Sequence, residues 1–255
     1  MKIAFSRPTA DRSEQGELIE NYSRIGYQGL QLKAGQYMPY VDTPQQFCDE
    51  WGAHAGVAAG LIFGGGLDDE GIARLRKLFA FGGAVGAERV IFCHGLPRAQ
   101  VDNEDIKRFA QTLTELGKEA QQAGVALSLH HHYNQPVMHR EDIALFFDTA
   151  DPSAVGLTID TAHLVKSGID DVAGVIREFG AVIDNFHLKD FADGEWRVLG
   201  HGGIDFTPVF AAIHDIGYTG WLCADEESGG DIIGGMQECL SFIRQQAVRP
   251  FGTES

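Results

Sequence analysis

Four ionisable residues, His130, Asp160, His187 and Asp225, each stand at or next to the end of a short apolar run in the second half of the chain. They lie about 30 residues apart, which is close to the length of one strand-and-helix unit in a parallel barrel. Two imidazoles and two carboxylates form a mixed nitrogen and oxygen ligand set, which suits Mn²⁺, Zn²⁺, Co²⁺ or Fe²⁺ better than Ca²⁺. If they converge, these residues predict a divalent metal site.

The elements that must position these residues are strands. Apolar runs with strand character alternate with helical patterns, and the runs are 2–6, 29–33, 56–63, 87–93, 124–130, 155–160, 182–189 and 220–225. The stretch from Ile106 to Ala120 shows helical spacing and is followed by Gly124. Eight such units predict an α/β fold, a (β/α)8 TIM barrel forming one domain over residues 1–255, with its chemistry at the C-terminal ends of the strands.

The composition excludes several classes of partner. The chain has 20 basic and 36 acidic residues and a net charge of −16, which repels nucleic acid and anionic lipid surfaces. No apolar run is long enough to cross a membrane, and the N-terminus lacks a secretory apolar segment. The four cysteines form no CxxC pair, as is usual for reduced thiols. We therefore expect a cytoplasmic protein without nucleic-acid or membrane partners; a homo-oligomer is compatible with the sequence.

Each candidate residue also has a purely structural interpretation. A single histidine at a strand end is usually hydrogen-bonded within the fold, Asp160 could cap the next helix, and residues 225–227 could form a solvated acidic turn. The coincidence of four strand ends favours a shared site instead. His130 and His132 are two residues apart, so we expect their side chains to share one face.

Several segments of the second half resemble the xylose isomerase-like barrel superfamily. They are DTAH (160–163), HLKD (187–190), LGHGGIDFTPVF (199–210) and GYTGWLCADEE (217–227). Their order and spacing are specific, and the eight-unit pattern extends the resemblance to nearly the whole chain. The superfamily contains sugar isomerases and epimerases, inosose dehydratases and, more distantly, endonuclease IV.

The resemblance implies a metal site at the same strand ends. Asp160 and His187 match family ligands directly. His130 stands where the epimerases have a glutamate, in a triple-histidine segment that resembles inosose dehydratases. At the eighth strand the family has a glutamate, and here the ligand is expected to be Asp225, with Glu226 as the alternative. The expected cofactor is a divalent metal, Mn²⁺ first, with Zn²⁺, Co²⁺, Fe²⁺ or Mg²⁺ as alternatives.

The implied activity is that of a metal-dependent isomerase or epimerase that removes a proton α to the carbonyl of a keto-sugar or related polyol. An alternative is an inosose dehydratase-type lyase, because this sequence lacks the first of the two glutamates that act as bases in the epimerases. Asp225 or Glu226 would then take the proton, and Lys189 or His163 would assist departure of hydroxide. A barrel that binds a ligand without catalysis is a third alternative, and the negative charge argues against a nuclease.

Four further residues are candidates for contact with a small polyhydroxy carbonyl substrate. His132 shares the face of His130, and His94 ends the fourth strand, where it could also be an additional metal ligand. Trp196 and Arg197 lie on the loop before residue 199 and could bind a carbohydrate-like molecule. Each of the four also fits an ordinary structural or surface position.

Overall fold

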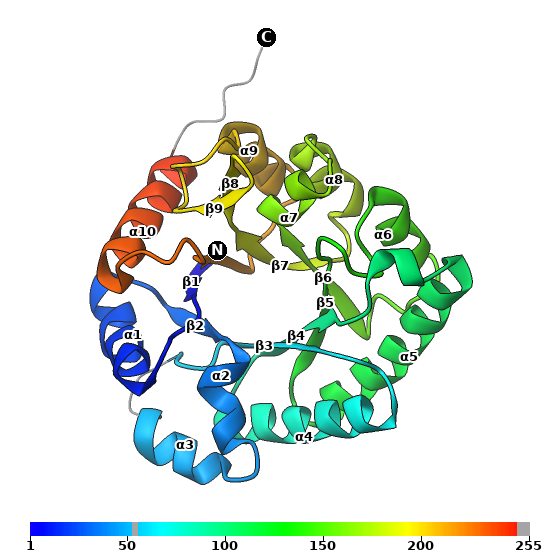
Figure 1. Cartoon of the computed structure of the whole chain (residues 1–255), viewed down its shortest axis with the longest axis horizontal. Coiled ribbons are helices and arrows are strands. Elements are labelled where there is room, and N and C mark those ends of the chain that lie inside the picture. The colour runs from blue at the N-terminus through cyan, green and yellow to red at the C-terminus, as the bar shows by residue number, and fades with distance from the viewer. Residues whose placement is uncertain (53–55, 249–255) are drawn as a thin grey trace.

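The computed structural model describes residues 1–52 and 56–248, and within them it shows a closed barrel of parallel strands (Figure 1). In chain order the barrel strands are β1 (Lys2–Ser6), β2 (Gly29–Leu32), β3 (Gly60–Gly65), β4 (Arg89–His94), β5 (Ala126–His130), β6 (Val155–Asp160), β7 (Ile183–Leu188) and β10 (Trp221–Asp225). Successive barrel strands are neighbours, and β1 closes the ring by pairing with both β2 and β10. The predicted TIM barrel is confirmed.

Helices surround the strands on the outside of the ring (Figure 1). In the described part of the chain they are α1 (Arg12–Ile25), α2 (Ala34–Tyr37), α3 (Pro44–Trp51), α4 (Asp69–Val85), α5 (Asn103–Gln122), α6 (Arg140–Phe147), α7 (Thr161–Lys166), α8 (Val172–Phe179), α9 (Phe206–Asp215) and α10 (Ile232–Val248). Two short 3₁₀ helices, η1 (Met38–Tyr40) and η2 (Arg98–Gln100), lie in the connections.

Helix α5 illustrates how the sequence builds these elements. The Asp102 side chain accepts the Asp105 N–H at 2.9 Å, and the Asp105 side chain accepts the Asp102 N–H at the same distance, so the first turn is capped from both sides. Ile106 and Phe109 belong to the buried face of the helix. Each such side chain contributes about 1.5–3 kcal/mol on full burial. Gly124 follows with a φ of +82°, and this left-handed turn leads into β5.

The outer face of the barrel strands, which the helices cover, is apolar, and the inner face is partly polar. The main core packs between the outer face of the strands and the helices. A second apolar cluster is separate from it and consists of Ala4, Ala59, Trp221 and Cys223. Cys223 lies opposite His187 in the parallel register, so the two side chains share the inner face. Polar side chains on the same face therefore lie in a buried environment that favours hydrogen bonds between them.

Two details differ from the sequence prediction. The third strand begins at Gly60 and not at Gly56, because Gly56 adopts a φ of +75° and its carbonyl accepts the N–H groups of Leu30 and Ala59. A hairpin of β8 (Asp190–Ala192) and β9 (Glu195–Arg197) follows β7 and was not predicted, since three-residue strands carry little periodicity.

The extent of the chain bears on two expectations. The single-domain prediction over residues 1–255 includes residues 53–55 and 249–255, which lie outside the described residues. In the remainder, no helix is both long and apolar enough to span a lipid bilayer.

Candidate active site

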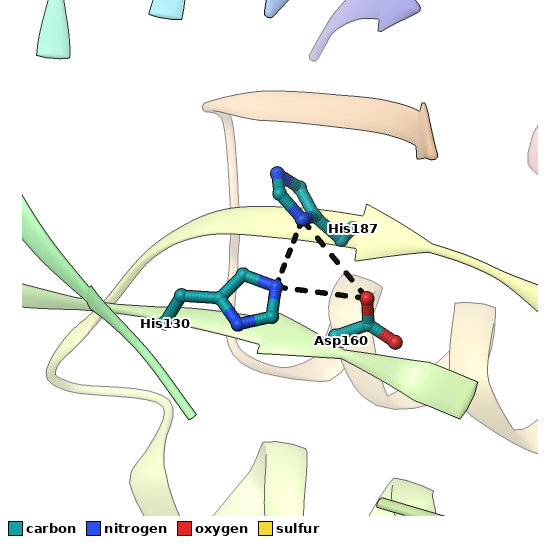
Figure 2. Close-up of side chains that lie close together, drawn as sticks. All are labelled: His130, Asp160 and His187. Carbon is teal, nitrogen blue, oxygen red and sulfur yellow. Dashed lines mark hydrogen bonds and ion pairs between the residues drawn. The ribbon is translucent and has the colours of Figure 1, made fainter. Parts of the chain in front are cut away.

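His130, Asp160 and His187 meet at the C-terminal ends of β5, β6 and β7, and all three are buried (Figure 2). His130 Nε2 lies 3.0 Å from His187 Nδ1 and 3.6 Å from Asp160 Oδ2, and His187 Nδ1 lies 4.0 Å from the same oxygen. The structure thus brings three of the four predicted ligands within 4.8 Å of one another. Two nitrogens and one oxygen face a common point.

Asp160 has both of the roles that the sequence left open. Its Oδ1 accepts the N–H groups of Ala162 at 3.0 Å and His163 at 2.9 Å, which caps helix α7. Its Oδ2 is buried, points at the two imidazoles and has no hydrogen-bond partner in the described residues. The cap holds the carboxylate in one orientation and leaves the second oxygen available.

The two imidazoles of the cluster differ in protonation. Burial lowers the pKa of His187 to about 3, although Asp225 opposes this, so this ring is neutral at pH 7. Burial also disfavours a charged His130, but Cys93 and Asp160 outweigh it and raise the pKa of His130 to about 10. For Asp160, burial opposes ionisation, yet the positive charges of Lys189 and His130 hold its pKa well below the usual value. A cation in this place would displace the His130 proton.

Asp225 belongs to a closed ring of ion pairs beside the cluster. Lys33 Nζ lies 2.6 Å from Asp225 Oδ1 and 2.7 Å from Glu227 Oε1. Lys189 Nζ lies 2.9 Å from Asp225 Oδ2 and 2.7 Å from Glu227 Oε2. Asp225 Oδ2 is also 3.8 Å from His187 Nδ1. The four charges therefore neutralise one another at the edge of the metal-ligand cluster.

Glu226 points away from this ring. Its Oε2 lies 3.0 Å from a guanidinium nitrogen of Arg7, and its Oε1 accepts the N–H of Ser228 at 2.6 Å. Successive residues of an extended segment face opposite sides, so Asp225 and Glu227 share the inner side while Glu226 does not. This geometry favours Asp225 over Glu226 as the eighth-strand residue of the site.

Histidine and tryptophan rings form one wall of the site. The ring centroids of His132 and His163 are 3.7 Å apart, and that of His163 lies 5.6 Å from that of His130 and 5.0 Å from that of Trp196. Lys189 Nζ is 4.7 Å from the centre of a Trp196 ring. Burial lowers the pKa of His163 well below its usual value. Burial also opposes a charged Lys189, but Asp225, Asp160 and Glu227 together outweigh it and raise the pKa of Lys189. His163 is therefore neutral and Lys189 is charged.

Two other predicted residues lie outside this arrangement. The described interactions of His94 are local: its Nδ1 accepts the Leu96 N–H at 3.2 Å, and its ring lies edge-on to Phe109. Arg197 is half exposed, and its only ion pair among the described residues is with Asp193 at 3.6 Å. It lines a cavity of about 430 Å³ together with Trp196, so a substrate contact by Arg197 stays a prediction.

The sequence analysis missed Lys33, Gln31, Glu227 and Arg7. Lys33 and Arg7 directly follow the ends of β2 and β1, so the rule that C-terminal strand ends carry the chemistry could have found them. Glu227 follows Asp225 by two residues, which places it on the same side. Gln31 gave no local signal; its Oε1 accepts from His187 Nε2 at 2.8 Å across the barrel.

Comparison with known proteins supports this architecture. A family model described as a xylose isomerase-like TIM barrel matches residues 19–246. An inosose dehydratase of Clostridium tetani (strain Massachusetts / E88) is 34% identical over 143 residues, 49% of this chain and 48% of that protein. One from Clostridium perfringens (strain 13 / Type A) is 31% identical over 146 residues, 50% of this chain and 49% of that protein. The match thus spans about half the length of these curated relatives.

Solved structures share the fold over almost the whole chain. A structure of L-ribulose 3-epimerase has a TM-score of 0.78 at 19% identity and covers 97% of this chain and 95% of its own. An IOLI protein with a binding zinc atom has a TM-score of 0.77 at 18% identity, and the match covers 97% of this chain and 98% of that protein's chain. A probable 3-DHS dehydratase from Bacillus anthracis has a TM-score of 0.77 at 12% identity, and the match covers 96% of this chain and 99% of that protein's chain. At these identities the likeness concerns the fold.

Proposed function

Because the chain belongs to the xylose isomerase-like TIM barrel family, we propose that it is a divalent-metal-dependent enzyme that removes the proton α to the carbonyl of a small polyhydroxy ketone. The observation that carries the proposal is the buried cluster of His130, Asp160 and His187 at the C-terminal ends of three strands. An acidic chain with a net charge of −16 suits such a neutral substrate better than a nucleic acid.

The residues present fit a divalent cation. Asp160 Oδ2 is buried without a hydrogen-bond partner, and two imidazole nitrogens face it. A buried carboxylate oxygen is costly unless it is paired or binds a metal. His130, Asp160 and His187 would hold the cation, which we expect to be Mn²⁺, with Zn²⁺ supported by the zinc atom of the IOLI protein. Bound there, it would supply Lewis-acid polarisation of the substrate carbonyl.

Asp225 is the residue that we assign as the base. Burial opposes its ionisation, but Lys189 and Lys33 hold the pKa of Asp225 well below the usual value, so it is ionised. The same lysines place positive charge where an enolate oxygen would develop, which lowers the cost of that charge. Both carboxylate oxygens of Asp225 are paired with lysines, so Asp225 could bind the cation only by giving up its contact with Lys33 or with Lys189.

Elimination of water is the finer reaction that we propose. The α C–H proton passes to Asp225, the C–O bond on the β carbon breaks, and the leaving hydroxide takes a proton from Lys189, so a C=C bond and one water form. Lys189 Nζ and Asp225 Oδ2 are 2.9 Å apart, and a single proton transfer between them restores both groups. The chain therefore needs no further donor to complete a turnover.

The arrangement of carboxylates favours elimination over epimerisation. Asp225 and Glu227 both come from the end of β10, while the end of β5 carries His130 and no carboxylate. A base on one face suffices for elimination, whereas inversion of a carbon needs a base on each face. The matching inosose dehydratases support the same choice, with a keto-inositol as substrate. An isomerase or epimerase shares the first step and is the second candidate.

The test is mass spectrometry of a keto-inositol and a panel of keto-sugars incubated with the Mn²⁺-loaded protein. We expect loss of water from a keto-inositol, abolished by Lys189→Met. Lys166→Met is the matched control, because Lys166 also lies over Trp196, at 4.3 Å, but is outside the ion-pair ring. Retained water loss in Lys189→Met protein contradicts the assignment, and absence of any reaction in metal-loaded protein favours a binding barrel.

A further inference from the structure

A continuous line of polar side chains runs inside the barrel from the metal-ligand cluster toward the opposite end of the strands. Its members, in order of contact, are His187, Gln31, Asn185, Thr158, Ser128, Asp184 and Arg89. The four between His187 and Asp184 are buried with an exposure of 1% or less. Of these four, only Gln31 is hydrogen-bonded to a residue of the metal-ligand cluster, so the proposed chemistry does not explain why the other three are polar.

At the far end of the line, next to Arg89, the direction of each hydrogen bond from donor to acceptor is fixed. Burial raises the pKa of Asp184, but its Oδ2 lies 2.8 Å from the permanently charged guanidinium of Arg89, at NH1, which favours the carboxylate as an acceptor. Ser128 Oγ donates to Asp184 Oδ1 at 2.6 Å. A serine hydroxyl has a single hydrogen, so Ser128 must accept, and Thr158 must donate, in their mutual contact at 2.7 Å.

The same donor-to-acceptor direction continues through the side-chain amides of Asn185 and Gln31. Because the Thr158 hydrogen is committed to Ser128, Thr158 Oγ1 accepts from Asn185 Nδ2 at 3.4 Å. That orientation turns Asn185 Oδ1 toward Gln31, whose Nε2 donates to it at 2.7 Å, while Asn185 Nδ2 also donates to Gln31 Oε1 at 3.2 Å. Gln31 Oε1 then faces His187 Nε2 at 2.8 Å and can only accept, so the proton must be on Nε2 of the imidazole.

We propose that the Arg89–Asp184 ion pair fixes the tautomer of His187 through this directed line of hydrogen bonds, with Gln31 and Thr158 as positioning residues. His187 Nδ1 is then left without a proton, and this is the atom that faces His130 Nε2 and Asp160 Oδ2. The ring is in its ligand form before any cation arrives, which removes a reorganisation step from binding. Only the ligand role of His187 rests on the proposed function.

The test reads the tautomer directly, in metal-free protein, by ¹⁵N NMR of histidine-labelled protein with the His187 signals assigned by their loss in His187→Gln. We expect a protonated Nε2 and a bare Nδ1 in the wild type. Thr158→Val keeps the shape but cuts the line, so the amides of Gln31 and Asn185 can turn over together. We expect a mixture of the two tautomers in this variant and about a 10- to 100-fold loss of Mn²⁺ affinity.

Two variants separate this role from a merely structural one. Thr158→Ser restores a hydroxyl and should restore the single tautomer. Thr114→Val removes a buried hydroxyl of helix α5 that bonds only Ala110 and Asp151 in the described structure, and it should leave the His187 signals unchanged. A proton on Nδ1 in the wild type, or a wild-type tautomer in Thr158→Val, overturns the inference. A correct tautomer in a protein without catalytic activity overturns the proposed function and leaves this inference standing.

Discussion

Replacement of Asp160 by asparagine separates the two roles of this residue. Oδ1 accepts the N–H groups of Ala162 at 3.0 Å and His163 at 2.9 Å, and an asparagine oxygen can accept the same bonds. Asparagine and aspartate are equally good at the N-cap of a helix. The second oxygen, which faces His130 and His187, loses its negative charge in Asp160→Asn. We therefore expect folding to survive and metal binding to fail.

The size of the effect follows from linkage. A cation at 100 times its dissociation constant stabilises the folded protein by about 2.7 kcal/mol. For a protein of this length that corresponds to a rise in Tm of about 5–10 °C. Asp160→Asn should lose most of the rise, and its metal-free Tm should fall less than that of Asp160→Ala, because the cap is kept while the contact with charged His130 is lost. Asp160→Ala should lose the rise as well and, without the cap, a further 0.5–2 kcal/mol or so in metal-free protein.

The assay is thermal unfolding of the wild type and both variants with and without Mn²⁺. Asp205→Asn serves as the control, because Asp205 caps α9 by accepting the Thr207 N–H at 2.9 Å and is not part of the metal-ligand cluster. It should show the full rise in Tm. An undiminished rise in Asp160→Asn would refute the assignment of Asp160 as a ligand. A metal-free Tm as low as that of Asp160→Ala would refute the separation of the two roles.

Three further predictions concern residues around the cluster. Glu226→Gln leaves the buried Arg7 charge unpaired and should lower the free energy of urea unfolding by about 3–5 kcal/mol, with unchanged Mn²⁺ affinity. Burial lowers the pKa of His131 from 6.5 to about 3, so the unfolded chain binds the extra proton and stability falls as pH drops through that window. His131→Gln, which can still accept the Asp160 N–H, should reduce this slope by up to about 1.4 kcal/mol per pH unit in urea titrations. Trp196→Leu removes the ring beside His163 and Lys189 and should raise KM about two- to tenfold in steady-state assays, without a change in metal affinity.

The strand pattern was predictable because most barrel strands are apolar runs followed by a polar residue; β3 is the exception and ends in glycines. His130 and Asp160 end their strands as predicted, and His187 is one residue from the end of β7. These residues could be placed together from sequence because the C-terminal ends of parallel strands in a barrel lie at one level. The sequence already favoured Asp225 over Glu226, and the structure points the same way because Glu226 is paired with Arg7 on the other side.

The rest of the site depends on closure of the barrel. Lys33 meets Asp225 across a separation of 192 residues, and Gln31 meets His187 across 156. A lysine after a strand resembles an ordinary surface residue until closure of the barrel is known to bring the end of β10, two strands away, within its reach. The hairpin of β8 and β9 was missed for a different reason: its strands are short, and Asp190 holds the following loop by accepting the N–H groups of Gly200 and Gly202 at 2.9 Å.

Solvent deuterium exchange tests the central claim most directly. A keto-inositol or keto-sugar is incubated in D₂O with Mn²⁺-loaded protein, and its mass is compared with that from metal-free and His187→Ala protein. The proposed function predicts deuterium uptake or loss of water that needs both the metal and His187. The same exchange in metal-free protein, or in His187→Ala protein, would contradict proton abstraction at this metal-ligand cluster.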